Sequence, residues 1–286
     1  MKAINYYLEG FKISAGSIKM VIGIYLVYLV TGLLVAIPFY SAFRAAAGSS
    51  LLPEGLMKGF DATVIREILA SGGKTFIVFT RGLLPWIIAF LLLQIYVTGG
   101  IFSRISHPRG RYSFLAFHRS GTRNYWRFFK LVFWLLLIQI LIGLVLYLPY
   151  FLIIGAKEGL TDKQLMDPLL VIIVIHLITL VLIRLVADLA KSRMFERDSG
   201  KALKAIWFSV KLAFRRFPSV YLMGILLMVL PAAAFAGFYL LRSAVPAGNM
   251  TMVLVIGLIQ QLFILIRIFF HVWRLSSSYK FYLGSI

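Results

Sequence analysis

Five ionisable side chains lie within or at the ends of long apolar stretches of this sequence, where a charged group is costly and is a functional candidate by default. They are Arg184, Asp188, Arg267, His271 and His176. Arg184, Arg267 and His271 could together bind an anion or a lipid headgroup, and carboxylate and imidazole groups could instead relay protons. We favour a structural role, in which the arginines extend toward water and Asp188 pairs with an arginine of another helix. His176, near the middle of its stretch, is expected to be neutral and hydrogen-bonded within the protein.

A second set of candidates consists of basic residues that repeat at helical spacing beside aromatic residues. The first group forms one helical stripe, with Arg119, Arg123, Arg127 and Lys130. The second group, Lys201, Lys204, Lys211 and Arg215, lies opposite an apolar face of Leu203, Ile206, Trp207, Val210, Phe214 and Phe217. Amphipathic helices of this composition lie in the membrane interface. We therefore expect both groups to contact anionic lipid headgroups. The alternative is a docking surface for a cytoplasmic partner or a phosphorylated ligand.

Catalytic and cofactor motifs are missing from the sequence. It contains no HExxH zinc motif, no G-x-S-x-G nucleophile turn, no P-loop and no glycine-rich dinucleotide turn. The absence of cysteine excludes disulfides, iron–sulfur clusters and thiol nucleophiles. The sequence therefore predicts a protein that is not an enzyme and that has no cofactor or metal. It also predicts no nucleic-acid partner, because no nucleic-acid-binding motif appears.

The elements that must position these residues follow from the composition. The 286 residues are 61% hydrophobic and only 14% charged, whereas about a quarter of the residues of a soluble domain are charged. Six apolar stretches reach the ~20 residues that a helix needs to cross a bilayer, and they do not alternate as barrel strands would. They are roughly residues 20–40, 83–102, 131–153, 168–189, 219–241 and 251–273. The predicted fold is an all-α integral membrane bundle, a single domain of six transmembrane helices.

The distribution of charge predicts the orientation of these helices. An even number of spans places both termini on one side of the membrane. The segments on that side contain 22 basic and four acidic residues, whereas those on the other side contain eight basic and six acidic residues. By the positive-inside rule, both termini are cytoplasmic. We expect a multi-pass protein of the bacterial inner (plasma) membrane.

Amphipathic segments are predicted on both sides of the bundle. Basic interfacial helices are expected before the first, third and fifth spans, and Asp198 or Ser199 can cap the start of the third such helix. On the other side, residues 51–74 are expected to form an extracytoplasmic amphipathic segment. Small residues inside the spans, such as Gly32 and Ala36, are expected to allow close helix packing.

Three segments also carry a resemblance to known proteins. They are RNYWRFF at 123–129, DLAK at 188–191 and AFRRFP at 213–218. With these segments, the chain resembles six-span bacterial inner-membrane proteins. Its layout is similar to the membrane domain attached to some glycerophosphodiester phosphodiesterases. The resemblance implies a membrane domain and not phosphodiesterase activity, because no phosphodiesterase catalytic domain is recognised in the sequence.

Two classes of function remain after these exclusions. The first, which we favour, is a non-enzymatic accessory or scaffold subunit of a membrane complex, whose partners are membrane lipids and other membrane protein subunits. The second is a transporter or flippase of a lipid-like or anionic substrate. A transporter should gather polar residues near the middle of the membrane, whereas most polar residues of this sequence lie at the ends of the spans.

Overall fold

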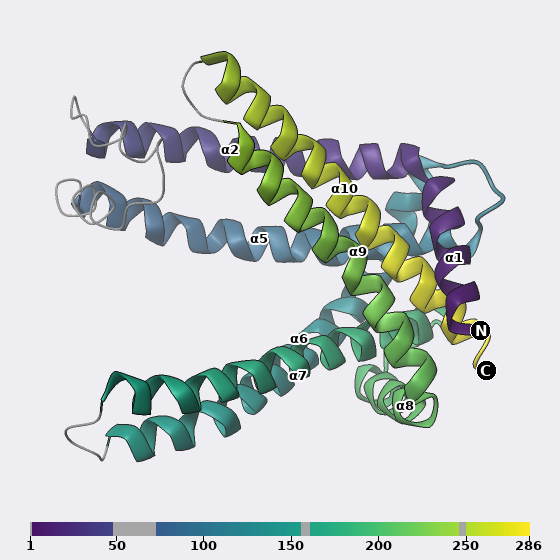
Figure 1. Ribbon diagram of the computed structural model, residues 1–286. Coiled ribbons are helices and arrows are strands. Elements are labelled where there is room, and N and C mark those ends of the chain that lie inside the picture. Colours follow the sequence, from purple (N-terminus) through teal and green to yellow (C-terminus); the bar gives the residue numbers. More distant parts are fainter. Residues whose placement is uncertain (1, 48–72, 156–160, 246–249) are drawn as a thin grey trace. The chain divides into compact units, whose positions relative to one another are not determined.

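The computed structural model describes residues 2–47, 73–155, 161–245 and 250–286. Within these ranges the chain is helical and contains no strand (Figure 1). The helices are α1 Lys2–Ala15, α2 Ile18–Ala47, α5 Gly73–Ser106, α6 Phe114–Gly155, α7 Asp162–Glu196, α8 Ala202–Arg215, α9 Phe217–Ala244 and α10 Met250–Leu283. The predicted all-α fold is therefore confirmed.

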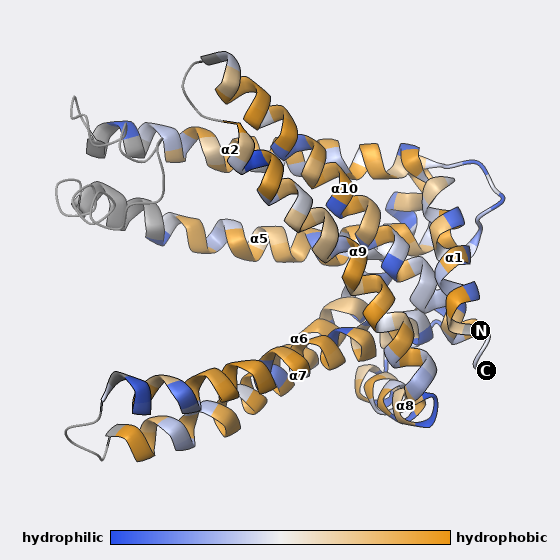
Figure 2. Ribbon diagram, viewed as in Figure 1, coloured by the Kyte–Doolittle hydropathy of each residue, from blue (hydrophilic) through white to orange (hydrophobic). Residues whose placement is uncertain are grey.

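Six of these helices, α2, α5, α6, α7, α9 and α10, are long and apolar enough to cross a membrane. Each contains one of the predicted spans, and Figure 2 shows how apolar residues dominate them. The protein is thus a polytopic membrane protein. The helices continue several residues beyond the predicted apolar stretches. Of the predicted segment 51–74, only residues 73 and 74 are described, and they begin α5.

The helices divide into two compact units. The first unit contains Met1–Gly16, Thr98–Leu227 and Trp273–Ile286, and the second contains Ser17–Val97 and Met228–Val272. The second unit is joined by local contacts between its own helices. The Tyr25 hydroxyl donates a 3.0 Å hydrogen bond to Gln261 Oε1, and the rings of Phe238 and Phe263 stack 4.6 Å apart.

An aromatic core holds the first unit together. Phe102, at the end of α5, is fully buried, and its ring lies 5.5 Å from Phe128 of α6, 5.1 Å from Phe195 of α7 and 5.9 Å from Tyr279 of α10. One ring therefore joins the ends of four helices. α6 packs against α7, and α8 packs against both. This core fixes the helix ends that carry most of the candidate residues.

Glycines allow two close approaches in the first unit. At Gly10 of α1, an added Cβ would lie 2.7 Å from the backbone nitrogen of Ser277 in α10. At Gly99 of α5, it would lie 3.1 Å from Cα of Gly121 in α6. Gly32, which the sequence favoured for close packing, has no atom within 4 Å of such a Cβ. Spacing of small residues alone did not identify the glycines that pack closely, because that depends on which helix lies opposite.

The segments predicted as interfacial helices take two different forms. α1 is a separate helix, and α8 is another. The basic segment before the third span is helical too, but it continues into the span without a break, so that α6 extends over 42 residues. The start of α8 also differs from the expectation. Its N-cap is Lys201, with no side-chain cap, and Asp198 instead lies in the turn that follows α7, at a positive φ of 48°.

Candidate functional site

The intramembrane carboxylate Asp188 forms an interhelical ion pair. Its side chain is 1% exposed, and its Oδ2 lies 2.8 Å from Nε of Arg274, on α10. Lys191, one turn further along α7, places its Nζ 3.4 Å from Oδ1. The predicted contact with an arginine of another helix is therefore present, and its partner is Arg274. Arg184 is exposed, as an arginine that extends toward water should be.

Two other candidates of the intramembrane set lie in the second unit. Arg267 and His271 belong to the part of α10 that precedes Trp273, whereas Arg184 belongs to the first unit. The anion site of Arg184, Arg267 and His271 therefore stays a prediction.

His176 has a hydrogen-bond partner on the neighbouring helix. Its Nε2 lies 2.8 Å from Nε2 of Gln139, which joins α7 to α6 within the apolar stretch. The Tyr147 ring lies 5.4 Å from the imidazole. This pair ties the two helices of the α6–α7 hairpin together, as expected for polar residues in a membrane bundle.

The basic stripe of α6 is shared between an acidic partner and open surface. Asp198 accepts hydrogen bonds from Arg123, at 2.7 Å, and from Arg127. These hydrogen bonds lower the pKa of the Asp198 carboxyl to about 2. Lys130 lies 5.9 Å from the ring centroid of Trp126, and Arg119 is exposed. Two of the four residues that were predicted to contact headgroups, Arg123 and Arg127, therefore already pair with a carboxylate.

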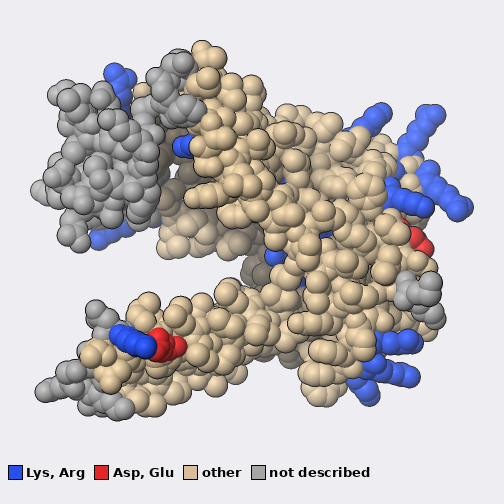
Figure 3. Space-filling model, viewed as in Figure 1, with Lys and Arg blue, Asp and Glu red and all other residues tan. Residues whose placement is uncertain are grey.

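α8 presents three faces instead of the two that the sequence predicts. Its basic residues Lys201, Lys204, Lys211 and Arg215 are exposed. Of the predicted apolar face, Trp207 is 71% and Phe214 is 76% exposed, whereas Ile206 is buried in the first unit. A third face is buried together with Ile206 and consists of Ala202, Ala205, Ser209 and Leu212. The guanidinium of Arg193 lies 3.6 Å from the centroid of the Phe208 ring. Because one face of α8 is buried in the first unit, only its exposed apolar residues are available to lipid. Figure 3 shows basic side chains beside α8.

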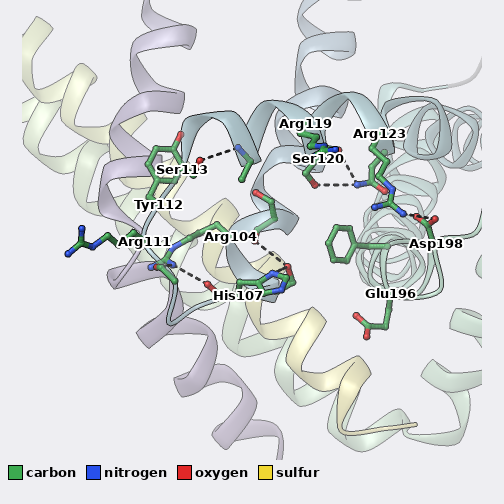
Figure 4. Close-up of a pocket in the computed structure, with 16 residues that line it drawn as sticks. Arg104, His107, Arg111, Tyr112, Ser113, Arg119, Ser120, Arg123, Glu196 and Asp198 are labelled. Carbon is green, nitrogen blue, oxygen red and sulfur yellow. Dashed lines mark hydrogen bonds and ion pairs between the residues drawn. The ribbon is translucent and has the colours of Figure 1, made fainter.

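A pocket of about 500 Å³ opens between the end of α5, the following loop, the start of α6 and the end of α7 (Figure 4). It is lined by Ser103, Arg104, Ser106, His107, Gly110, Arg111, Tyr112, Ser113, Ala116, Arg119, Ser120, Arg123, Asn124, Phe195, Glu196 and Asp198. Four arginines and two carboxylates therefore face it. Its lining is rich in hydroxyl groups and lies entirely within the first unit.

Several polar side chains of the pocket stabilise its walls. Arg104 donates to the carbonyl oxygens of His107 at 3.2 Å, Gly110 at 2.5 Å and Gly16 at 2.9 Å, and so shapes the loop. The Ser120 hydroxyl donates to the Gly99 carbonyl at 2.8 Å, where α5 and α6 cross. These groups form the walls of the pocket and are already engaged in hydrogen bonds.

Comparison of the chain with protein-family models, curated proteins and solved structures found no match. The resemblance to six-span bacterial membrane proteins therefore stays a prediction, and function is argued from geometry.

Sequence reasoning identified Arg119 and Arg123 but missed the pocket to which they belong. Arg104 and Arg111 entered only the count of basic residues on the predicted cytoplasmic side, and Tyr112 was not a candidate. The signal that could have drawn attention to them is the run HPRGRYS at 107–113, in which arginine, histidine, serine and glycine occur together. Its position opposite the end of α7 depends on tertiary contacts that the run itself does not encode.

Proposed function

We propose that this polytopic membrane protein is a non-enzymatic accessory or scaffold subunit of a complex in the bacterial inner membrane. In this proposal its basic end, formed by the basic residues of α8 and of the first part of α6, contacts anionic lipid headgroups on the cytoplasmic side. The observation that supports it is α8, where the exposed side chains of Trp207 and Phe214 accompany exposed Lys204, Lys211 and Arg215. A helix with this surface lies in the membrane interface, with its rings in the acyl boundary and its cations among phosphates.

The attachment of α8 supports a scaffold. Its inward face packs on α6 and α7, so the helix is a fixed part of the first unit and not a free arm. Each basic residue near an anionic surface contributes about 1 kcal/mol of attraction. A surface held in this way would fix the depth and orientation of the bundle and present the same basic face to a partner subunit.

The polar groups of the spans also fit a structural role. Asp188 is paired with Arg274, and Gln139 is paired with His176, so each polar contact joins two helices. The alternative, a transporter or flippase of a lipid-like or anionic substrate, would need such groups to converge on a substrate. Purification in mild detergent separates the two functions. A stoichiometric partner supports the subunit, and a lone protein with lipid in a central cavity supports transport.

The contact of α8 with lipid can be measured through Trp207. In proteoliposomes, a variant that retains only Trp207 as tryptophan is expected to be quenched more by brominated phosphatidylglycerol than by brominated phosphatidylcholine. The exposed cations beside the ring should enrich anionic lipid there. The substitutions Lys204→Gln, Lys211→Gln and Arg215→Gln together should remove the difference. A variant that retains only Trp273, which is buried, is the control and should be quenched by neither lipid. Equal quenching of Trp207 by both lipids would contradict the proposal.

The orientation can be tested with single cysteines, since the native sequence has none. Thr122→Cys, on the exposed surface of α6, should react with a membrane-impermeant maleimide only after cells are permeabilised. Ser243→Cys, exposed near the end of α9, should react in intact cells. Ser120, which the sequence also places on the cytoplasmic side, is less suitable because its hydroxyl donates a hydrogen bond to the Gly99 carbonyl. Ser71, which the sequence places on the outer side, lies outside the described residues. The reverse labelling pattern would place the basic end outside the cell.

A further inference from the structure

We propose that the pocket between α5, α6 and the end of α7 binds a phosphate group, and that Arg111 and Arg119 are the residues that contact it. The inference rests on the proposed function, because it assigns a specific phosphate site to the basic end that contacts lipid. The shared chemistry is an anionic phosphate group. A phospholipid headgroup and a free phosphate are the two sources that the experiment separates.

The charges in the pocket carry the argument. Its two carboxylates are already engaged, because Asp198 pairs with Arg123 and Arg127 and because Glu196 accepts a 2.7 Å hydrogen bond from the Tyr279 hydroxyl. Arg104 is engaged with backbone carbonyls. Within the described part of the chain, Arg111 and Arg119 have neither an ion pair nor a hydrogen bond to a side chain. The pocket is therefore lined by two exposed arginines that lack an acidic partner. In Figure 4 the Arg111 side chain points away from Arg119, so it must turn toward the pocket to contact the same phosphate.

The shape and donors of the pocket suit a phosphate. A volume of about 500 Å³ lies within the range of about 300–1,000 Å³ typical of small-molecule sites. Arginine is the side chain whose planar donors best match a phosphate. Two neutral donors face the same space, the Ser113 hydroxyl at the start of α6 and the Tyr112 phenol. The Tyr112 phenol is protonated near neutral pH and able to donate, and burial raises its pKa further.

The surroundings of the pocket favour a lipid as the source. Immediately after Ser113, the first turn of α6 exposes Phe114 and Leu115, which are 66% and 78% exposed. We infer that these two side chains, at the basic end of α6, lie in the acyl boundary as those of an interfacial helix do. A pocket beside them lies at the depth of the headgroups. A phospholipid with its tails along α6 would therefore place its phosphate at Arg111 and Arg119.

The test uses the full chain purified in dodecyl maltoside, with phosphatidylglycerol, phosphatidylcholine and inorganic phosphate as probes. Binding is followed as the rise in the thermal unfolding temperature, recorded by tryptophan fluorescence. Phosphatidylglycerol should stabilise the protein more than phosphatidylcholine does. Arg111→Gln with Arg119→Gln should weaken the apparent affinity by about tenfold for each arginine removed. If inorganic phosphate reproduces the stabilisation with the same dependence on arginine, the ligand is a free phosphate. If only the lipid does so, the ligand is a headgroup.

The matched control is Arg109→Gln, which removes the same charge from the same loop but does not line the pocket. It should leave the affinity unchanged. Equal weakening by Arg109→Gln would overturn the proposal, because it would show a diffuse attraction in place of a site. Stabilisation of the native protein by neither anionic probe would also overturn it.

Because Arg111 and Arg119 are exposed, the variants that lack them should unfold at the native temperature in the absence of lipid. Native mass spectrometry of retained lipid gives a second measurement. Failure here leaves the quenching of Trp207 intact, so it is distinguishable from failure of the proposed function.

Discussion

Replacing Asp188 by alanine is expected to lower the free energy of unfolding by about 3–5 kcal/mol. The substitution removes the carboxylate that lies between Arg274 and Lys191, whose side chains are only 12% and 14% exposed. Two cations would then remain in a nearly water-free environment without a counter-charge. Unfolding in mixed micelles of increasing dodecyl sulfate content measures the change. Asp188→Asn should behave similarly, because it keeps the shape and loses the charge.

The control for this prediction is Asp167→Asn, at an exposed position near the start of the same helix. It should change the free energy of unfolding by less than about 0.5 kcal/mol. The triple variant Asp188→Leu with Arg274→Met and Lys191→Met should recover much of the loss, since apolar residues often replace a buried group of paired charges without cost. If Asp188→Ala unfolded within about 1 kcal/mol of the native protein, the ion pair would not be a structural element.

Gly10→Ala is expected to separate α1 from α10 and to destabilise the protein by about 1–3 kcal/mol, the usual effect of overpacking. The new methyl group would lie 2.1 Å from Ser277 Oγ and 2.7 Å from its backbone nitrogen. A rotamer change at Ser277 cannot relieve the second contact. The helices must therefore move apart, although alanine itself favours a helix.

Trp273 reports this movement directly. Its indole nitrogen donates a 2.8 Å hydrogen bond to the Tyr7 carbonyl, and its ring lies 4.6 Å from the Tyr7 ring. In a variant with Trp273 as the only tryptophan, Gly10→Ala should shift the emission to longer wavelength as water reaches the ring. The control is Gly32→Ala, where no atom lies within 4 Å of the added methyl group and the emission should not change. An unshifted spectrum for Gly10→Ala would contradict the close approach.

Hydropathy was sufficient to predict the class of fold and the approximate position of each span, since a bilayer leaves helices as the main solution for long apolar segments. It could not predict where helices end. Asp198 looks like an N-cap for α8, but its place at the end of α7 follows from two arginines on α6, more than 70 residues earlier. Ile206 likewise has the periodicity of a lipid-facing residue, but it is buried against the protein. The sequence could not predict this, because an amphipathic pattern does not show whether lipid or protein covers the apolar face.

The same limit applies to the candidate residues. The pairing of Asp188 with an arginine could be predicted, because an unpaired carboxylate is costly inside a bundle. The identity of that arginine as Arg274 depends on how α7 and α10 lie against each other. The pocket could not be predicted at all, because its walls come from residues 103–124 and 195–198, and only the folded core brings them together.

The unbroken course of α6 has a mechanical consequence. With a rise of about 1.5 Å per residue, Arg119 at the pocket and Gln139 in the apolar stretch lie about 30 Å apart along one rigid rod. Helices respond to a thicker or thinner bilayer by changing their tilt. A tilt of about ten degrees would carry the arginine sideways by about 5 Å relative to the amide, by the same geometry. The sideways position of Arg119 is therefore coupled, through the tilt of α6, to the thickness of the membrane in which the protein lies.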